Sequence, residues 1–429
     1  MTAYRAWADI DLDALTHNLG VIRHKAGPGT RIVLVVKADA YGHGAVAIAS
    51  HAVRCGIAAL GVSTSAEALE LRSAGVRVPI LVLGTIVDDE AVDALRSDVH
   101  IALHSGERRA MLQELARRLG VRAKVHLKID TGLGRLGVLP SRAVDLLREI
   151  RRSSHLELAG VMTHVSAGEG AFAASTAEQA RVFEEVLRKA REERLLGGWI
   201  HMANSASLFT GLRPRYDTVR PGISAYGILP ADLPGAGDLR PILSLKTQIV
   251  FLKDVPQGTP VGYNSTWSAA HATRIATLPV GYNDGVPWRL SNHGAVLVRG
   301  HRARIVGRVS MDYITVDVGH IPNVHVGDEV TLIGTQGNET ISVEEIAAKV
   351  GTISYEITCS VGKRVQRRYV GGETLVLPSQ IAPFGAWPPR LPRSTSTAHD
   401  GGGNAFHAER APAEFDPSEL DPDFPHGRS

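Results

Sequence analysis

A lysine followed closely by a tyrosine and two glycines is the most chemically suggestive group in this sequence. Lys37 comes directly after the apolar run Ile32–Val36, and Tyr41, Gly42 and Gly44 follow it. An amine can form a Schiff base, a phenol can bind a phosphate oxygen, and glycines let backbone N–H groups approach an anion. This combination suits pyridoxal phosphate (PLP), whereas a lone lysine at a strand end is more often a solvated charge.

Other polar side chains follow later apolar runs of the chain. They are Lys128, Asp130 and Arg135, then His164, then His201, Asn204 and Ser205, and finally Arg220. Each one alone has a structural explanation, because strand ends commonly carry capping or solvated polar groups. Together they suggest a catalytic site if the fold brings the ends of these runs to one place.

Short apolar runs alternate with amphipathic stretches between about residues 30 and 230, and this alternation indicates the fold. We expect strands at Ile32–Val36, Ala58–Val62, Pro79–Leu83, His100–Leu103, Ala123–Ile129, Leu158–Met162, Trp199–Met202 and Thr218–Val219. Eight strand–helix units predict an α/β fold, a (β/α)8 TIM-type barrel, although a doubly wound open sheet gives the same alternation. In a barrel, the polar residues would meet at the carboxyl ends of the strands.

A phosphate site is expected at the loops after the last two barrel strands, where barrels commonly bind phosphate. Asn204 and Ser205 follow the seventh run, and Gly222 and Ile223 follow the eighth. The Ser205 hydroxyl and the backbone N–H groups of Gly222 and Ile223 can donate hydrogen bonds, although Gly222 alone also fits a plain turn. With Tyr41, these groups would close a phosphate cup.

The chain changes character after Pro241, where β-branched runs dominate. Strands are predicted at Ser244–Leu252, Ala272–Leu278, Ala295–Val298, Arg304–Val309, Tyr313–Val318, Glu329–Ile333 and Ser354–Val361, with one helix at Val343–Val350. We therefore expect a PLP-binding barrel over residues 1–240 and a mostly β domain over residues 241–370. Residues 371–429 are expected to be a disordered tail, because 9 of the 22 prolines lie from Pro378 onward.

The composition excludes several classes of protein. The formal net charge of +3 is small for 429 residues, and no dense Lys/Arg run occurs, which disfavours binding to nucleic acid or a membrane surface. Cys55 and Cys359 do not form a metal-ligand spacing, so no metal is expected, and two thiols fit a reducing compartment. The N-terminus does not resemble a signal peptide, and we expect a cytoplasmic protein.

Eight ordered motifs resemble those of the alanine racemase family. They are Val36–Gly44, which reads VKADAYGHG, then Lys128–Gly137, Met162–His164, His201–Ala206, Val219–Ile223 with Tyr226–Gly227, Gly281–Gly285, Gly307–Asp312 and Ser354–Glu356. The resemblance covers about residues 4–370. It implies a PLP-dependent isomerase that interconverts L-alanine and D-alanine and supplies D-alanine for peptidoglycan.

The resemblance also implies a role for each site residue. Lys37 would carry PLP and act as a base on one face of the substrate, and Tyr282 would act on the opposite face. Arg220 would contact the pyridine nitrogen and leave it neutral, which favours racemisation over transamination. The other implied residues are Tyr41, His164, Asn204, Ser205, Gly222, Ile223 and Tyr355 for the cofactor, Arg135 and Met311 for the substrate, and Lys128 as a candidate for carbamylation.

Family members pair so that the β domain of one subunit completes the barrel site of the other. The resemblance therefore implies a homodimer in which Tyr282, Met311 and Tyr355 reach the partner's site. The sequence departs from the family pattern at Leu133, residues 165–170, Asn283 and Ser310, which touch the pocket wall.

These departures leave a broader amino-acid racemase acting on serine as the nearest alternative. A PLP-dependent decarboxylase is less favoured, because Arg220 replaces the acidic partner that it would need for the pyridine nitrogen. A non-catalytic PLP-binding protein is also less favoured, because such a protein consists of the barrel alone.

Overall fold

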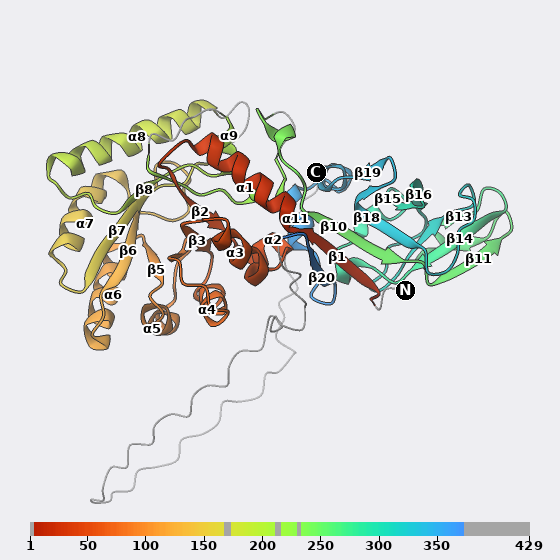
Figure 1. Ribbon diagram of the computed structural model, residues 1–429, viewed down its shortest axis with the longest axis horizontal. Helices are drawn as coiled ribbons and strands as arrows, with labels where there is room; N and C mark the ends of the chain where they lie inside the picture. Colours follow the sequence, from red (N-terminus) through yellow and green to blue (C-terminus); the bar gives the residue numbers. More distant parts are fainter. Residues whose placement is uncertain (1–3, 167–172, 211–215, 230–232, 373–429) are drawn as a thin grey trace, which may run out of the picture. The chain divides into compact units, whose positions relative to one another are not determined.

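The computed structural model of the chain describes residues 4–166, 173–210, 216–229 and 233–372 (Figure 1). The described residues form a barrel of parallel strands and a mostly antiparallel sheet. The predicted tail over residues 371–429 lies outside the described residues from position 373 onward, as do residues 167–170 of the departures from the family pattern.

Eight parallel strands close into the predicted barrel. Around the barrel they are β2 (Arg31–Val35), β3 (Ala59–Val62), β4 (Ile80–Val82), β5 (His100–Leu103), β6 (Ala123–Lys128), β7 (Leu156–Met162), β8 (Trp199–His201) and β9 (Thr218–Val219). Strand β9 pairs with β2, which closes the barrel. The prediction of a (β/α)8 barrel is confirmed, and closure excludes the doubly wound open sheet, which has two free edges.

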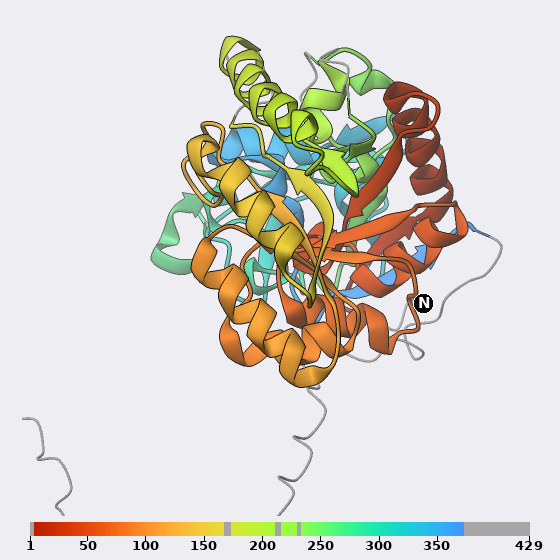
Figure 2. The same ribbon diagram turned by 90° about the vertical axis from the view of Figure 1, so that its left-hand side faces the viewer.

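Helices cover the outside of the barrel strands (Figure 2). They include α1 (Leu12–Ala26), α3 (Ala45–Arg54), α4 (Ser65–Ser73), α5 (Asp88–Arg96), α6 (Gly106–Leu119), α7 (Pro140–Arg152), α8 (Ala173–Glu192) and the short α9 (Ser205–Phe209). Helix α7 shows why they pack there: it buries Ala143, Leu146, Leu147 and Ile150, at helical spacing. No helix within the described ranges is long and apolar enough to cross a membrane.

The second region is a ten-stranded sheet whose path runs β11-β14-β17-β16-β15-β18-β10-β1-β20, with β19 beside β18. Its strands are β1 (Ala6–Asp11), β10 (Leu243–Gln248), β11 (Phe251–Val255), β14 (Thr273–Leu278), β15 (Ala295–Val298), β16 (His301–Ile305), β17 (Ile314–Asp317), β18 (Glu329–Gln336), β19 (Glu339–Ile341) and β20 (Gln366–Val370). Strands β12 (Pro260–Val261) and β13 (Trp267–Ser268) form a separate pair. The predicted helix is confirmed as α10 (Val343–Val350).

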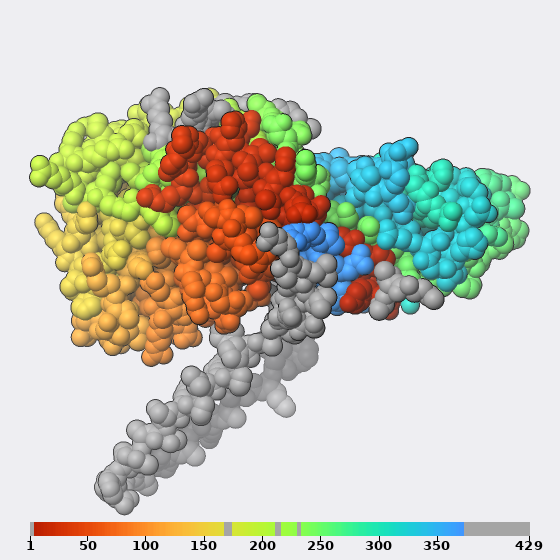
Figure 3. Space-filling view, in the orientation of Figure 1, coloured from red at the N-terminus to blue at the C-terminus, as the bar shows by residue number. Residues whose placement is uncertain are grey.

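The N-terminal strand belongs to this sheet and not to the barrel. Strand β1 pairs antiparallel with β10 and parallel with β20, although it lies within the segment predicted as barrel. Figure 3 shows these segments from the two ends of the described chain, red and blue, side by side at the surface. The sheet therefore ties the start of the chain to its last described strand.

One predicted strand is wrong. Ser354–Val361 contains the helix α11 (Ser354–Cys359), which packs against α10 and against the turn that carries Lys37. The β-branched Ile357 and Thr358 suggested a strand, but both are buried on one side of this short helix, so packing overrides local propensity. The predicted strand Ser244–Leu252 is divided between β10 and β11, and Arg304–Val309 covers only the end of β16.

Candidate active site

Lys37 begins α2 (Lys37–Gly42), a single turn directly after β2. Four successive residues of this turn have φ between 52° and 56° and are therefore left-handed: Ala38, Asp39, Ala40 and Tyr41. This conformation costs an L-residue about 1–2 kcal/mol, so the surroundings must hold the turn in place. Backbone strain of this kind concentrates at functional sites.

Two carboxylates hold the turn from the barrel side. Glu67 on α4 accepts hydrogen bonds from the backbone N–H groups of Ala38 and Ser63, both at 2.7 Å. Asp39 within the turn accepts from the N–H of Ala45 at 2.7 Å, which fixes the start of α3. The turn is thus anchored to the two helices that follow it.

The β domain holds the same turn from the other side. Arg367 on β20 donates to the carbonyl of Gly42 from Nε at 3.1 Å and from Nη2 at 3.0 Å. A Cβ at Gly42 would clash with the carbonyl oxygen of Thr358, and one at Gly44 would clash with the hydroxyl of Tyr369. These glycines are therefore explained by the close approach of the β domain, which the sequence interpretation had not considered.

Tyr41 lies among three other groups of the same chain. Its ring centroid is 5.1 Å from that of Tyr226 and 5.9 Å from that of Tyr355, and a Cβ at Gly222 would lie 2.5 Å from its hydroxyl oxygen. The expectation that Tyr355 reaches the site of the partner subunit is therefore wrong: it stands beside Tyr41 of its own chain. Only a glycine at position 222 leaves room for the phenol.

Ser205 can donate a hydrogen bond from its hydroxyl at the predicted phosphate cup around Tyr41. Its Oγ accepts from the N–H of Gly222 at 2.9 Å, from the N–H of Ser224 at 3.3 Å and from the Ser224 hydroxyl at 3.0 Å. Because its lone pairs are engaged, its own proton is free to bind an anion. Asn204 caps α9 by accepting from the N–H of Ser207 at 2.9 Å, and Ile223 is buried in the following turn.

Arg220 is buried after β9, with only 4% of its surface exposed. Its Nη2 donates to the carbonyls of Thr163 and Met202 at 2.8 and 3.1 Å. Its Nη1 lies 2.9 Å from Nδ1 of His201, and its Nη2 lies 3.2 Å from Nδ1 of His164. The Nε–H has no hydrogen-bond partner within the described ranges and remains available to a ligand.

The charge of Arg220 decides the protonation of its neighbours. Burial lowers the pKa of Arg220 to about 10, so it is still a cation at neutral pH. Burial and then the Arg220 charge lower the pKa of His164 to about 3, so this imidazole is neutral. Because a guanidinium can only donate, Nδ1 of His201, which faces Nη1, must be an acceptor without a proton.

Lys128 lies at the end of β6 with its amine largely removed from water. Its Nζ donates to the carbonyl of Leu83 at 3.1 Å. Burial, followed by the charges of Arg135 and Arg220, lowers its pKa to about 8. Some neutral amine is therefore present near neutral pH, and carbamylation requires that form.

Arg135 follows on an ordered loop. The Asp130 carboxylate shapes this loop by accepting from the N–H groups of Gly132, Leu133 and Gly134, at 3.0, 2.9 and 3.1 Å. Arg135 itself is exposed and makes no ion pair with any described residue. Its guanidinium can therefore bind a substrate carboxylate.

Tyr282 and Met311 lie outside this group of residues, on an exposed face of the β domain. Tyr282 is 45% exposed and Met311 is 52% exposed. The backbone N–H of Tyr282 donates to the carbonyl of Ser310 at 3.0 Å, so the two residues sit on adjacent loops. Arg364 joins these loops by donating to Asp284 from Nε at 2.6 Å and to the Met311 carbonyl at 3.3 Å.

The structure also singles out Tyr263, which the sequence interpretation missed. Tyr263 is 71% exposed, the largest value among the large apolar and aromatic side chains of the described ranges. It lies in a strained segment, because the non-glycine residues Asn264 and Ser265 have φ of 60° and 46°, and Gly262 before it has φ of 80°. A glycine and an asparagine flanking a tyrosine are a sequence signal for positive φ, and this signal could have drawn attention to the residue.

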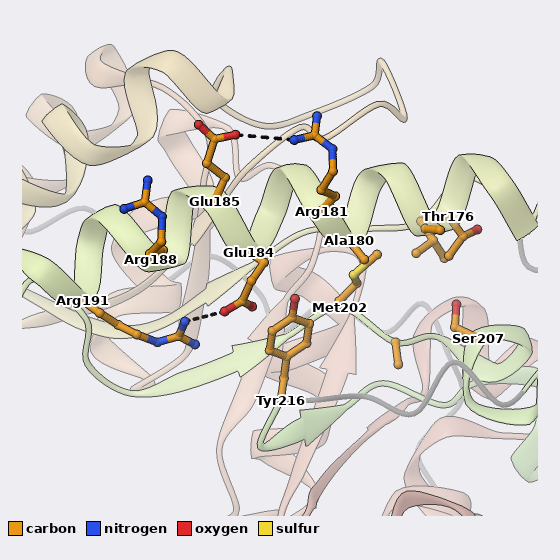
Figure 4. Close-up of a pocket in the computed structure, with 13 residues that line it drawn as sticks. Thr176, Ala180, Arg181, Glu184, Glu185, Arg188, Arg191, Met202, Ser207 and Tyr216 are labelled. Carbon is orange, nitrogen blue, oxygen red and sulfur yellow. Dashed lines mark hydrogen bonds and ion pairs between the residues drawn. The ribbon is translucent and has the colours of Figure 1, made fainter.

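A separate cavity of about 660 Å³ lies between α8 and the chain around β8 and α9 (Figure 4). Its lining includes Ala180 on α8 and Met202 and Ala203, which follow β8. Charged groups on α8 pair with one another at its rim, as Arg191 does with Glu184 at 2.6 Å. No predicted site residue lines this cavity, so it is distinct from the candidate active site.

Comparison with known families covers both parts of the chain. The family described as "Alanine racemase, N-terminal domain" matches residues 10–230, and "Alanine racemase, C-terminal domain" matches residues 242–369. An alanine racemase of Syntrophobacter fumaroxidans is 44% identical over 371 residues, which is 86% of this chain and 98% of the relative. One of Halothermothrix orenii is 43% identical over 370 residues, 85% of this chain and 98% of the relative.

Solved structures agree with these matches. An alanine racemase of Clostridium difficile 630 superposes with a TM-score of 0.83 at 34% identity, covering 88% of this chain and 98% of that one. The alanine racemase of Bartonella henselae with covalently bound pyridoxal phosphate has a TM-score of 0.75 at 30% identity, covering 85% of this chain and 99% of that one. With both domains matched in order, this chain belongs to the alanine racemase family.

Proposed function

We propose that this protein interconverts L-alanine and D-alanine with PLP bound covalently to Lys37. One observation carries the proposal: Lys37, the Tyr41 cup and the buried Arg220 all lie at the carboxyl ends of the barrel strands of a chain that belongs to the alanine racemase family. The Bartonella henselae relative holds covalently bound pyridoxal phosphate, which supports the same cofactor here.

The residues present fit PLP. Lys37 offers the amine. Tyr41, Ser205 and Gly222 lie close together with Tyr355 beside Tyr41, Ile223 follows Gly222, and Asn204 caps the adjacent helix α9. The free proton of the Ser205 hydroxyl and the close approach of Gly222 to Tyr41 suit an anion. When bound, PLP supplies an electron sink that makes the α-proton of an amino acid acidic.

Arg220 is proposed to contact the pyridine nitrogen through its unpaired Nε–H. A guanidinium that stays charged at neutral pH can donate a hydrogen bond but cannot give up its proton readily. A ring nitrogen held by this donor would remain neutral, and the electron sink would be weaker than beside a carboxylate. Weaker delocalisation favours return of a proton to the α-carbon over transamination.

Inversion at the α-carbon requires acid–base groups on opposite faces, and we propose Lys37 for one face and a β-domain tyrosine for the other. Tyr282 is the candidate that the motif resemblance gives. Tyr263 is the candidate that the structure favours, because it combines the larger exposure with a strained backbone. A phenol has an ordinary pKa of about 10, so either tyrosine needs cationic neighbours to exchange protons near neutral pH.

Arg135 and the backbone N–H of Met311 are proposed to bind the substrate carboxylate. Carbamylation of Lys128 would place an anion beside Arg135 and orient its guanidinium. Serine is not favoured as the preferred substrate, because the two departing hydroxyls are already engaged. Ser310 donates to the Tyr313 carbonyl at 2.7 Å, and Ser166 donates to Oε1 of Gln179 at 2.8 Å.

The exposed β-domain groups support our proposal that the active enzyme is a homodimer. Tyr263, Tyr282 and Met311 are open to solvent in one chain, so we propose that they complete the barrel site of a second copy. Supply of D-alanine for peptidoglycan in the cytoplasm is the physiological role that this activity implies.

Purified protein supplied with PLP tests the proposal. We expect conversion of L-alanine to D-alanine, and a visible absorbance band from the lysine-bound cofactor. Lys37→Ala should lower the rate by at least about 10³-fold and abolish the band. The exposed Lys189→Ala serves as the matched control and should change neither quantity. Racemisation that survives in Lys37→Ala would contradict the assignment.

A further inference from the structure

Three histidines form a continuous hydrogen-bonded chain through the barrel interior to Arg220. Nδ1 of His100 lies 3.0 Å from Nε2 of His126, and Nδ1 of His126 lies 2.9 Å from Nε2 of His201. Nδ1 of His201 lies 2.9 Å from Nη1 of Arg220. The exposed fractions of the three histidines are 7%, 0% and 0%, so almost no water reaches the chain.

The hydrogen-bonded chain of histidines crosses the barrel from one end to the other. His100 is the first residue of β5, His126 lies within β6, and His201 is the last residue of β8 (Figure 1). Strand β7 lies between β6 and β8, and its Gly160 makes the crossing possible. A Cβ at Gly160 would clash with the ring of His126, so a glycine is required for the two imidazoles to meet.

Each hydrogen bond of the chain has only one allowed direction. Arg220 can only donate, so Nδ1 of His201 accepts, and a neutral His201 carries its proton on Nε2. This proton is donated to Nδ1 of His126, whose own proton therefore lies on Nε2 and is donated to Nδ1 of His100. All three imidazoles are thus the Nε2–H tautomer, and the direction is set by Arg220.

The surroundings favour neutral imidazoles along the whole chain. Burial holds the pKa of His126 and His201 well below the ordinary value, and burial followed by the charge of Lys124 lowers that of His100 to about 4. Trp199 covers the chain, with ring centroids 5.8 Å from His100 and 5.6 Å from His126. A proton added at either end would place two donors face to face.

We propose that His100, His126 and His201 are positioning residues whose directional hydrogen-bonded chain orients the guanidinium of Arg220 and leaves its Nε–H free for the cofactor ring. The inference rests on the proposed function only for the last step, the contact of Arg220 with PLP. The direction of the chain follows from the contacts alone and can be tested separately.

The experiment is 15N NMR of the PLP-loaded, histidine-labelled full chain. At pH 7, the signals of His100, His126 and His201 should show a protonated Nε2 and a bare Nδ1. Two variants probe the middle of the chain: His126→Asn keeps an acceptor oxygen near the position of Nδ1, and His126→Leu removes it. His155→Leu, which changes a histidine outside the chain, is the matched control.

In His126→Leu, the Nε2–H of His201 loses its acceptor, so its signal should shift and exchange faster with water. The value of kcat should fall roughly 10-fold with KM for L-alanine nearly unchanged, and the share of transamination should rise. His126→Asn should restore the His201 signal and most of kcat, which a purely structural role of His126 would not explain.

The proposal is overturned if Nδ1 of His201 carries the proton in the unmodified protein, or if the two His126 variants give the same His201 signal and the same kcat. Should His126→Leu fail to fold, the tautomers of the unmodified protein still decide the direction. The NMR spectrum reports the tautomers whether or not the protein racemises alanine. A wrong proposal for the activity can therefore be distinguished from a wrong proposal for the three histidines.

Discussion

The barrel site and the exposed face of the β domain are organised in opposite ways. In the barrel, Arg220 and His201 are almost fully buried, and each has named hydrogen-bond partners in its own chain. On the β domain, Tyr263, Tyr282 and Met311 are between 45% and 71% exposed. The first half of the site is preorganised within one chain, whereas the second half is exposed, as we expect of groups that complete the site of another molecule.

Backbone strain shows the same contrast. The left-handed turn after Lys37 is held by Glu67 from the barrel and by Arg367 from the β domain. The strained segment around Tyr263 joins the paired strands β12 and β13, and its Gly262 approaches the backbone of Gly307 and Arg308, but the Tyr263 side chain is 71% exposed. Strain that is covered within the chain keeps the cofactor site rigid, and strain at an exposed residue suggests a position completed by a partner.

The largest expected effect comes from removing the hydroxyl of the second acid–base group. Tyr263→Phe should lower kcat by roughly 10²–10⁴-fold while absorbance of the bound cofactor persists, because general acid–base catalysis contributes about that much. Tyr282→Phe is the matched comparison and should lower kcat far less. If Tyr282→Phe lowers kcat more than Tyr263→Phe in the same racemisation assay, Tyr282 is the second acid–base group.

A smaller effect is expected from filling the contact between the turn and the β domain. Gly42→Ala should destabilise the protein about 1–3 kcal/mol more than Gly75→Ala, as measured by urea unfolding. Both glycines have φ close to 87°, but a Cβ at Gly42 would clash with Thr358, and one at Gly75 meets nothing within 4 Å. Equal losses would show that the β domain does not hold the turn tightly.

A loss of stability in acid, comparable in size to the Gly42 effect, is expected to originate in the barrel. The pKa of His100 is lowered to about 4, whereas an unfolded histidine has a pKa of about 6.5. The unfolded state therefore binds more protons below pH 6.5, and stability falls as the pH drops from there towards 4. For His100 this amounts to about 2 kcal/mol between pH 7 and pH 5.

Urea unfolding of the PLP-loaded protein at several pH values measures this loss. In His100→Asn the slope of the unfolding free energy against pH should be shallower over the same range, because the titrating group is gone. An unchanged slope would assign the acid sensitivity to groups other than His100.

The barrel could be predicted from sequence because buried parallel strands are continuous apolar runs, as in Ile32–Val36. The polar residues after those runs, such as Ser205 and Arg220, could be predicted for the same reason, since barrel topology gathers strand ends. The left-handed turn could not be predicted. Four successive residues in that conformation contradict local preference and exist only because Glu67, Asp39 and Arg367 hold them.

The helix α11 and the role of Tyr263 escaped prediction for related reasons. Ser354–Cys359 is a six-residue helix without a side-chain cap, so only its packing against the Lys37 turn defines it. Tyr263 is distinguished mainly by its exposure, which is a tertiary property, although the flanking Gly262 and Asn264 signal the positive φ angles beside it. The placement of Tyr355 beside Tyr41 likewise depends on how the β domain folds back onto the barrel.

Mixing two inactive variants tests most directly whether one site combines residues of two chains. Lys37→Ala is mixed with whichever tyrosine variant, Tyr263→Phe or Tyr282→Phe, abolishes racemisation, and the subunits are allowed to exchange. A shared site predicts that mixed dimers regain one intact site, giving about a quarter of the unmodified activity at equal proportions. If the mixture stays inactive although mixed dimers form, lysine and tyrosine act within a single chain and the account is wrong.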